Sequence, residues 1–376
     1  MTFELGNWQF ECCACGWLAR NDRPVWRCEE CAGELRVIGL DSPAIADGGR
    51  GLWKWSNTLP VRLTDRSTLL GEGDSPLVPI EIDGVAVHLK LDSLLPSGSF
   101  KDRGAAVLAT WLRAISAERI IVDSSGNAAA AMAAFAARVG LDCTVYVPAS
   151  APSGKLVQAR AYGARVVPVE GTREDVARAA EAEAELDRGA SYASHNWHPV
   201  FVEGVKTWAL EVSEQLDGRE PDLVFVPTGG GSALVGAWYG FQASGGAMPA
   251  LIACQPAACS PVVRAWEQSA GIEPFQPQDT LADGTKIALP SRPRQILDAI
   301  SQTGGGAIAV DEDVLLESMK LLWQMGIYVE PTAALGVAAC RLAIASGGVD
   351  SGQVVVVHIT GHGLKATSLI QDLLDA

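Results

Sequence analysis

Short apolar runs alternate with helical patterns along the chain from about residue 85 onward. The runs that predict strands lie at 85–91, 119–124, 143–148, 164–169, 222–228, 250–256 and 353–360. The segments that follow the first four of them predict helices at 103–115, 126–140, 155–163 and 173–189. Strands that are apolar nearly throughout and alternate with helices are typical of parallel sheets covered on both faces. The pattern therefore predicts an α/β fold.

Polar and glycine-rich loops follow several of these strands, where ligands bind in parallel sheets. They lie at 124–127, 228–232, 330–332 and 360–363. In the second loop, Gly229, Gly230 and Gly231 precede Ser232 and Ala233 at the start of a predicted helix. Consecutive glycines there free backbone N–H groups to surround a phosphate at the positive end of a helix. The loop matches neither the Walker pattern nor G-x-G-x-x-G. Tight packing is the alternative reason for its glycines.

The stretch SFKDRGA, residues 99–105, places Lys101 at a helix start between Gly98 and Gly104. Alone, it could be an ordinary solvated lysine. Together with Asn127, the glycine loop and Thr360, it forms a set that suits pyridoxal 5′-phosphate (PLP). The lysine would form a Schiff base with the aldehyde. The loop would hold the phosphate, Asn127 would donate to the ring hydroxyl, and the neutral Thr360 hydroxyl would meet the ring nitrogen.

The bulk composition narrows the classes of function. The chain has 376 residues, 48% of them hydrophobic and 19% charged, which is enough for two domains. A net charge of −15 argues against nucleic-acid binding, because phosphate backbones attract a basic surface. The longest apolar run, 128–137, is about half of what spans a bilayer. We see no secretion signal at the N-terminus and expect a cytoplasmic protein without membrane contact.

Two Cys-x-x-Cys pairs near the N-terminus predict a metal site. Cys12 and Cys15 form the first pair, and Cys28 and Cys31 form the second, with twelve residues between the pairs. Four thiolates at this spacing suit tetrahedral zinc in a structural zinc ribbon. A redox dithiol and a disulfide are the alternatives. Cys13 could also replace Cys12 after a shift of one residue.

Nearly the whole chain resembles the threonine synthase branch of the fold-type II, tryptophan synthase β-like PLP enzymes. The matching motifs are GEGDSPL (71–77), LPSGSFKDRG (95–104), SSGNAAAAMAAFAARVG (124–140), PTGGGSALVGAWYGF (227–241) and ITGHGLK (359–365). The resemblance implies a Schiff base at Lys101, cofactor contacts from Asn127, residues 229–233 and Thr360, and a homodimer. It also implies a zinc ribbon at 1–40, a large PLP-binding domain at 41–104 and 200–376, and a smaller mobile domain at 105–199.

One departure from the family concerns the substrate. Threonine synthases share N-P-x-R-x-E-G-Q-K-T, whose arginine helps to hold the substrate phosphate, whereas residues 198–207 read HPVFVEGVKT. Phe201 replaces the arginine, and a phenyl ring offers no charge-assisted donor. Arg160 and Lys155 are candidate replacements. Otherwise the substrate is not O-phosphohomoserine, and the polar residues 195–198 suit another group. A surface loop is the alternative explanation for 195–198. Ser124, Ser125, His198 and Phe201 are candidate substrate contacts.

These observations favour PLP-dependent elimination or replacement on a small amino acid. A neutral partner for the ring nitrogen fits this chemistry better than transamination. The alternatives are a genuine threonine synthase, a serine or threonine dehydratase-type lyase, and a β-replacement synthase. From a different class, the chain could be a catalytically silent binding protein that kept the fold.

Overall fold

The four-stranded sheet and the six-stranded sheet of the chain lie in different compact units of the computed structural model. The structure describes residues 3–40, 49–63, 69–151, 153–187 and 189–375, without the side chains of residues 153 and 155. Unit 1 comprises Met1–Asp74, Leu95–Ser97 and Lys101–Thr207, and unit 2 comprises Ser75–Leu94, Gly98–Phe100 and Trp208–Ala376. The domain boundaries expected at residues 40, 104 and 199 remain predictions.

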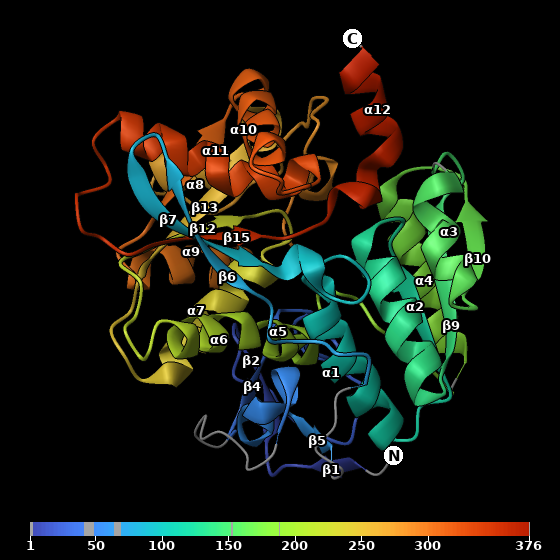
Figure 1. Cartoon of the computed structure of the whole chain (residues 1–376). Helices are drawn as coiled ribbons and strands as arrows, with labels where there is room; N and C mark the ends of the chain where they lie inside the picture. Colours follow the sequence, from blue (N-terminus) through green and yellow to red (C-terminus); the bar gives the residue numbers. More distant parts are fainter. Residues whose placement is uncertain (1–2, 41–48, 64–68, 152, 188, 376) are drawn as a thin grey trace. The chain divides into compact units, whose positions relative to one another are not determined.

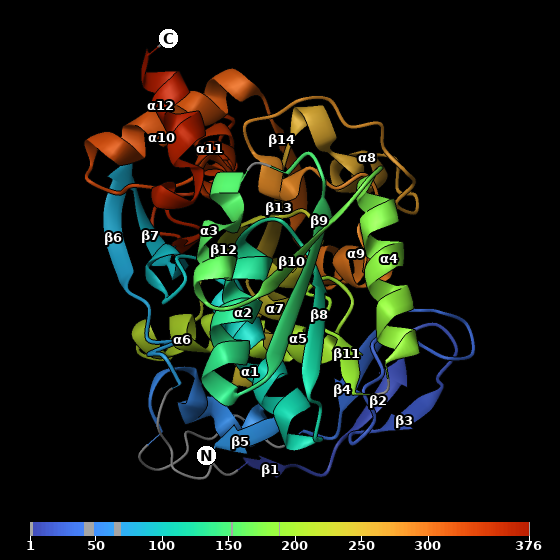
Figure 2. The same cartoon turned by 90° about the vertical axis from the view of Figure 1, so that its right-hand side faces the viewer.

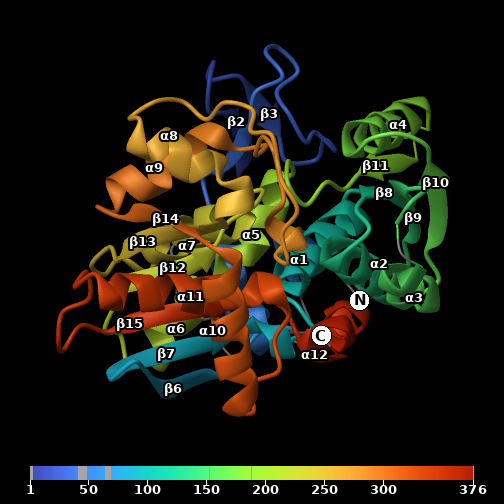
Figure 3. The same cartoon turned by 90° about the horizontal axis from the view of Figure 1, so that it is seen from above.

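Unit 1 contains a four-stranded parallel sheet in the order β10-β9-β8-β11. Its elements are α1 (Lys101–Ala114), β8 (Arg119–Asp123), α2 (Asn127–Val139), β9 (Asp142–Pro148), α3 (Ser153–Ala161), β10 (Arg165–Val169), α4 (Arg173–Leu186), β11 (Ala190–Tyr192) and α5 (Pro199–Val205). Helices α2 and α3 cover one face of this sheet and α4 covers the other (Figures 2 and 3).

Local chemistry sets the helix ends in this unit. Helix α2 is rich in alanine and ends at Gly140, whose φ of 77° is readily adopted only by glycine. Helix α4 begins with a capping box in which Thr172 and Asp175 exchange hydrogen bonds. The predicted alternation is therefore observed, although the short strand β11 did not stand out from its sequence.

The N-terminal part of unit 1 is made of short antiparallel strands. One small sheet has the order β3-β2-β4, and the other pairs β1 with β5. The elements are β1 (Phe3–Leu5), β2 (Gln9–Cys12), β3 (Leu18–Arg20), β4 (Leu35–Ile38), the 3-10 helix η1 (Gly51–Thr58) and β5 (Val61–Leu63). Phe10 of β2 packs edge-on against Trp111 of α1, with ring centroids 5.7 Å apart, so the ribbon shares a core with this helix.

Unit 2 is built on a six-stranded sheet in the order β14-β13-β12-β15-β7-β6, in which only the edge strand β6 is antiparallel to its neighbour. Its strands are β6 (Leu77–Ile82), β7 (Val85–Leu91), β12 (Leu223–Pro227), β13 (Ala250–Pro256), β14 (Gly306–Val310) and β15 (Val355–Ile359). Every residue of β15 is buried, as expected for a central strand of a covered sheet.

Helices cover both faces of this sheet. They are α7 (Ser232–Ser244), α8 (Pro261–Glu267), α9 (Pro293–Gln302), α10 (Glu312–Gln324), α11 (Pro331–Ala345) and α12 (Thr367–Asp375), with short 3-10 helices at Asp92–Leu94, Ala257–Cys259, Asp283–Thr285 and Gly363–Ala366. Helix α6 (Thr207–Gln215) begins at the last residue of unit 1. Figure 1 shows α10 and α11 above the sheet and α7 below it. In the described part of the chain, no helix is long and apolar enough to cross a bilayer.

Candidate active site

The carboxyl ends of β12 and β15 carry two of the predicted cofactor contacts. These strands are hydrogen-bonded neighbours, and both run in the same direction. Thr360 follows β15, and the glycine loop 228–231 follows β12. A parallel sheet therefore brings a hydroxyl and a helix N-terminus to one edge of unit 2.

The Thr360 side chain is buried, and its hydroxyl is not hydrogen-bonded within the described part of the protein. The residue is 2% exposed, and its Oγ1 has no hydrogen-bond partner among the described residues. Buried hydroxyls rarely remain unpaired in folded proteins. A pyridine nitrogen would accept the hydrogen bond that this hydroxyl can donate.

The glycine loop leaves the first turn of α7 without a side-chain cap. Gly231 is the N-cap residue, with a φ of 89°, and no side chain caps the helix. A Cβ atom at Gly231 would lie 2.5 Å from Ile296 Cδ1, and one at Gly229 would lie 2.9 Å from Thr285 Cα. These glycines are therefore needed for packing, as the alternative interpretation held. They also expose the N–H groups of the first helical turn, which suit a phosphate. Together with Thr360, the loop fits PLP.

The segment that precedes Lys101 is tied to the end of β15. The Phe100 amide donates to the Thr360 carbonyl at 3.0 Å, and Ser99 pairs with Gly361. Gly98, with a φ of 88°, accepts a hydrogen bond from the His362 amide at 3.0 Å. Lys101 is the next residue after Phe100, so chain connectivity brings the proposed Schiff-base lysine to this segment.

Lys101 is the first residue of α1 and is half-buried. The turn before it is fixed by Asp102, whose carboxylate accepts hydrogen bonds from the Ser97 amide at 2.6 Å and from the Ser97 hydroxyl at 2.5 Å. Asp102 also lies in the first turn of the helix, where a negative charge is stabilising.

Phe201 lies next to Lys101 and is fully buried. Its ring centroid is 5.8 Å from Lys101 Nζ. A Cβ atom at Gly104 would come within 2.5 Å of the Phe201 ring, and one at Gly204 would come within 2.3 Å of the Arg103 carbonyl oxygen. Helices α1 and α5 therefore pack so closely that only glycine fits at positions 104 and 204, and the Phe201 ring lies against Gly104. A phenyl ring thus occupies the position that holds arginine in the N-P-x-R motif.

The other predicted substrate residues, together with the predicted cofactor contact Asn127, fall into two groups. Ser124, Ser125 and Asn127 are half-buried at the β8–α2 turn, where the Gly126 amide donates to Ser124 Oγ at 3.3 Å. His198 is buried, caps α5 through Nδ1, and packs 5.1 Å from the Trp111 ring. These contacts make it part of the core that joins the ribbon to α1.

Residues 195–198 do not form a surface loop, because His195, Asn196 and His198 are all buried. Among the candidate cations, Arg160 is exposed on α3, and the side chain of Lys155 lies outside the described residues.

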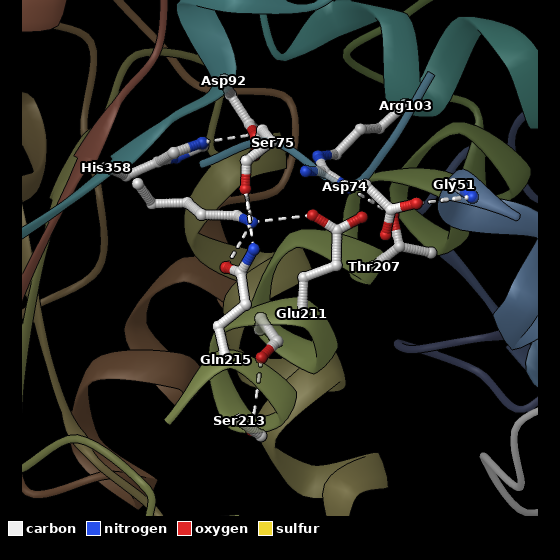
Figure 4. A network of polar contacts seen from close by, with 12 residues as sticks. Gly51, Asp74, Ser75, Asp92, Arg103, Thr207, Glu211, Ser213, Gln215 and His358 are labelled. Atoms are coloured by element: carbon white, nitrogen blue, oxygen red, sulfur yellow. Dashed lines mark hydrogen bonds and ion pairs between the residues drawn. The ribbon is translucent and has the colours of Figure 1, made fainter. Parts of the chain in front are cut away.

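A buried polar network supports the strand that leads to Thr360 (Figure 4). His358 Nε2 lies 3.0 Å from Asp92 Oδ2, and the Ser75 hydroxyl donates to Asp92 Oδ1 at 2.6 Å. The Trp208 ring stacks on His358, with centroids 4.2 Å apart, and Phe100 packs on it at 5.5 Å. The network thereby fixes the ends of β7 and β15 around the segment that carries Phe100.

The same region contains a buried ion pair. Lys90 Nζ donates to Glu211 at 2.7 Å, to Gln215 at 2.9 Å and to the Ser75 carbonyl at 2.7 Å. Lys90 and Glu211 are both fully buried, so each charge depends on the other. This pair has no signature in the sequence, because one lysine in a strand and one glutamate in a distant helix form no pattern.

The four paired cysteines form one cluster. The Sγ atoms of Cys12, Cys15, Cys28 and Cys31 all lie within 4.8 Å of one another. The Cys12–Cys31 distance is 3.5 Å and the Cys15–Cys28 distance is 3.6 Å. Tetrahedral zinc with bonds of about 2.3 Å separates its sulfur ligands by about 3.8 Å. Cys12, rather than Cys13, belongs to the cluster.

The protonation of these thiols also suits a metal site. Burial raises the pKa of Cys12, but hydrogen bonds from the backbone of Cys15 and Ala14 outweigh it and lower that pKa to about 7. The Gly33 backbone lowers the pKa of Cys31, but the neighbouring sulfurs of Cys12 and Cys15 raise it to about 12. Thiols this close cannot all ionise without a cation between them.

Comparisons with known proteins agree with these features. The pattern of the family described as "Pyridoxal-phosphate dependent enzyme" matches residues 68–361. The chain is 32% identical to the threonine synthase of Methanocaldococcus jannaschii over 94% of this chain and 92% of that one. It is 31% identical to the threonine synthase of Mycobacterium tuberculosis (strain ATCC 25618 / H37Rv) over 83% of this chain and 87% of that one.

Solved structures that are similar to this chain include further amino-acid enzymes. A threonine deaminase from the organism abbreviated T.th. is 30% identical, with a TM-score of 0.66 over 77% of this chain and 92% of that one. The serine racemase of Dictyostelium discoideum is 26% identical, with a TM-score of 0.68 over 77% of this chain and 92% of that one. The predicted α/β fold, enzyme class and cofactor family are therefore confirmed. The chain belongs to the family of pyridoxal-phosphate-dependent enzymes and has the fold-type II architecture.

Proposed function

We propose that this enzyme catalyses elimination or replacement on a small amino acid, and that O-phosphohomoserine is a poor substrate or none. The observation that carries the second part is Phe201, a buried ring beside Lys101 at the position of the motif's arginine. A phosphate dianion is bound by charge-assisted donors, each worth about 1.5–3 kcal/mol. Without this donor, recognition of a phosphorylated substrate should fall about ten- to a hundredfold.

The chain's own residues have distinct roles in this proposal. Lys101 holds the cofactor and then moves the proton at the substrate Cα. The N–H groups of residues 229–233 bind the phosphate, and Asn127 donates to the ring hydroxyl. When bound, PLP supplies an acceptor for the electron pair released at Cα. Thr360 offers the ring nitrogen a neutral hydroxyl, which favours elimination and replacement over transamination.

Two further proposals concern the whole molecule. One zinc ion bound by Cys12, Cys15, Cys28 and Cys31 would stabilise the ribbon, because four thiolates leave no open coordination position for catalysis. We also propose a homodimer that acts on a small-molecule amino-acid substrate. The mass of the protein in solution tests the oligomeric state.

The experiment that tests the function is a turnover assay of the purified holoenzyme with O-phosphohomoserine, L-serine, L-threonine and their O-acyl esters. We expect keto-acid or replacement products from at least one compound that has no phosphate. Efficient formation of threonine from O-phosphohomoserine would show a genuine threonine synthase, the activity named for the relatives at about 30% identity. Arg160 and Lys155 would then be the first residues to replace.

A second assay tests the role of Lys101. Borohydride reduction of the holoenzyme should attach the cofactor covalently to Lys101, as read by peptide mass spectrometry. Lys101→Ala should keep phosphate-dependent cofactor binding but lose this attachment and all turnover. Normal turnover in Lys101→Ala would refute the assignment. If the cofactor is attached at Lys101 but no amino acid is turned over, the alternative of a catalytically silent binding protein would be favoured.

A further inference from the structure

Several buried polar side chains lie at the carboxyl ends of the strands of the four-stranded sheet. They are not among the residues proposed to bind the cofactor. Asp123 ends β8, Tyr192 ends β11, and Ser194 and His195 follow β11. Strands β8 and β11 are parallel neighbours, and the Ala193 amide donates to the Ile121 carbonyl at 2.8 Å. This register carries Ser194 to the level of Asp123. All of these residues belong to unit 1, as Lys101 does.

Asp123, Ser194 and His195 each have a buried polar atom without a hydrogen-bond partner among the described residues. Asp123 is 9% exposed and His195 is 5% exposed. Asp123 Oδ1 and His195 Nδ1 have no hydrogen-bond partner among the described residues. Buried carboxylates and imidazoles are normally paired, because leaving them unpaired is costly. Such a pair at the ligand-binding edge of a parallel sheet points to a bound molecule.

Burial and the surrounding charges set the protonation states of Asp123 and His195. Burial raises the pKa of Asp123 to about 6, although the Arg173 charge and a hydrogen bond from Tyr192 lower it. Burial, followed by the charges of Lys101 and Arg173, holds the pKa of His195 well below its ordinary value. Near pH 7.5 the cluster therefore offers a carboxylate and a neutral imidazole.

The cluster also lies close to the reactive lysine. The His195 ring is 6.2 Å from the Phe201 ring, which in turn is 5.8 Å from Lys101 Nζ. Helix α5, which carries Phe201, begins only four residues after His195. His195 and Lys101 therefore share one neighbour, the Phe201 ring, within the same unit that carries Asp123.

The chemistry of the cluster selects among distal groups. A phosphate or carboxylate would be repelled by Asp123. An ammonium group would meet the positive charge of Arg173, which already disfavours the protonation of His195. A neutral amide has N–H groups for the carboxylate and a carbonyl for an imidazole N–H or the Ser194 hydroxyl.

We infer that Asp123 and His195 bind a neutral, amide-type group at the distal end of the amino-acid substrate. This inference rests on the proposed function, in which the substrate is not a phosphate ester. It assigns the specificity of the enzyme to the end of β8 and to the segment after β11. Carboxamide and ureido groups share this donor and acceptor pattern, and the test separates them.

The test is equilibrium binding to the holoenzyme at pH 7.5, read from the visible absorbance of the lysine-bound cofactor. The probes are L-asparagine, L-glutamine and L-citrulline, each compared with an acidic counterpart (L-aspartate or L-glutamate) and an apolar counterpart (L-norvaline or L-norleucine). We expect at least one amide to bind about tenfold or more tightly than both counterparts. A ureido group is indicated if L-citrulline binds tightest, and a carboxamide if L-asparagine or L-glutamine does.

Asp123→Asn supplies the variant arm, because it keeps the shape of the side chain and removes its charge. It should reduce the preference for amide over acid about tenfold and leave the absorbance of the free holoenzyme unchanged. Asp142→Asn is the matched control, because Asp142 is exposed at the start of β9, at the opposite edge of the same sheet. His195→Gln should also weaken amide binding, and it provides a second test if Asp123→Asn does not fold.

The inference is overturned if no amide binds more tightly than both its counterparts, or if Asp123→Asn weakens amides and acids equally. These results differ from failure of the proposed function. That function fails if borohydride does not attach the cofactor at Lys101, or if O-phosphohomoserine is converted efficiently. A holoenzyme that passes both of those tests but shows no amide preference refutes this inference alone.

Discussion

Substituting Gly104 by alanine tests whether the position of Phe201 is set by packing between α1 and α5. A Cβ atom at Gly104 would meet three atoms of the Phe201 ring at 2.5–2.6 Å. Real carbon–carbon contacts lie near 3.5–4.0 Å, so about 1 Å of movement is required. Phe201 is fully buried, so its ring has little free space to move into, and α5 also lies close to α1 at Gly204.

The expected cost follows from two opposing effects. Gly→Ala within a helix normally stabilises a protein by about 0.4–1 kcal/mol. Overpacking of a core costs about 1–3 kcal/mol. We therefore expect Gly104→Ala to lower the free energy of unfolding by about 1–2 kcal/mol in net terms. Because α1 begins at Lys101, we also expect a lower affinity for PLP.

The assay compares three single variants and one double variant, with unfolding followed in denaturant at saturating PLP. Gly154→Ala on α3 is the control, since its added Cβ would have no described atom within 4 Å apart from its chain neighbours and the backbone of its own helix. It should leave stability unchanged or raise it. Phe201→Leu removes the ring and should relieve the clash, so that Gly104→Ala costs less in this background than in the wild type.

The reasoning is refuted if Gly104→Ala stabilises the protein as much as Gly154→Ala does. It is also refuted if Phe201→Leu and Gly104→Ala add without coupling. In either case the ring would be free to move, and its position beside Lys101 would not limit the choice of substrate.

The remaining predictions concern the ribbon, the cofactor and pH. Protein prepared without chelator should contain one zinc per chain, and Cys28→Ser should lower both metal content and stability more than it changes the cofactor absorbance. Thr360→Val should weaken PLP binding about fivefold or more without removing the attachment at Lys101, and unchanged affinity would exclude the ring-nitrogen contact. Asp123 has a folded pKa of about 6, above its unfolded value of about 3.9. The folded state therefore binds more protons between pH 4 and 6, and this group lowers stability as pH rises through that window, by about 2–3 kcal/mol in total. Asp123→Asn should remove that slope and stabilise the protein at pH 7, which parallel unfolding curves at pH 4.5 and 7 would show.

The sequence predicts much of this architecture because strand and helix periodicities are local properties. The runs at 85–91 and 353–360 correspond to β7 and β15, and the glycine loop lies before α7 as expected. Strand β11 has only three residues, too few for a period to appear, and the five residues of β14, GAIAV, are mostly glycine and alanine, which carry little strand preference. The buried pairs Lys90–Glu211 and Asp92–His358 join residues 121 and 266 positions apart, so only tertiary structure reveals them.

The candidate site was predictable to the extent that its residues fall in motifs. Lys101, Asn127 and Thr360 stand in recognisable stretches, whereas Asp123 reads as the polar end of an apolar strand. Its meaning depends on its burial and on His195, which lies 72 positions away and reaches the same sheet edge only through the pairing of β8 with β11. The sequence also left residues 195–198 open to interpretation as a surface loop, because a polar segment has no signature of burial.

Phe201 and Asp123 both disfavour an anionic distal group on the substrate. Phe201 leaves no cation at the position that the family motif gives to arginine, and Asp123 is a buried carboxylate at the carboxyl end of β8. Either residue alone would weaken the binding of a phosphate group. The loss of a phosphate site, however, gives no reason for a carboxylate whose burial opposes folding at neutral pH. A group that costs stability is maintained when a ligand or a reaction repays it. The proposed substrate, with a neutral and polar distal end, would account for both Phe201 and Asp123, and a variant that changes only one of these two residues should recover little phosphate binding.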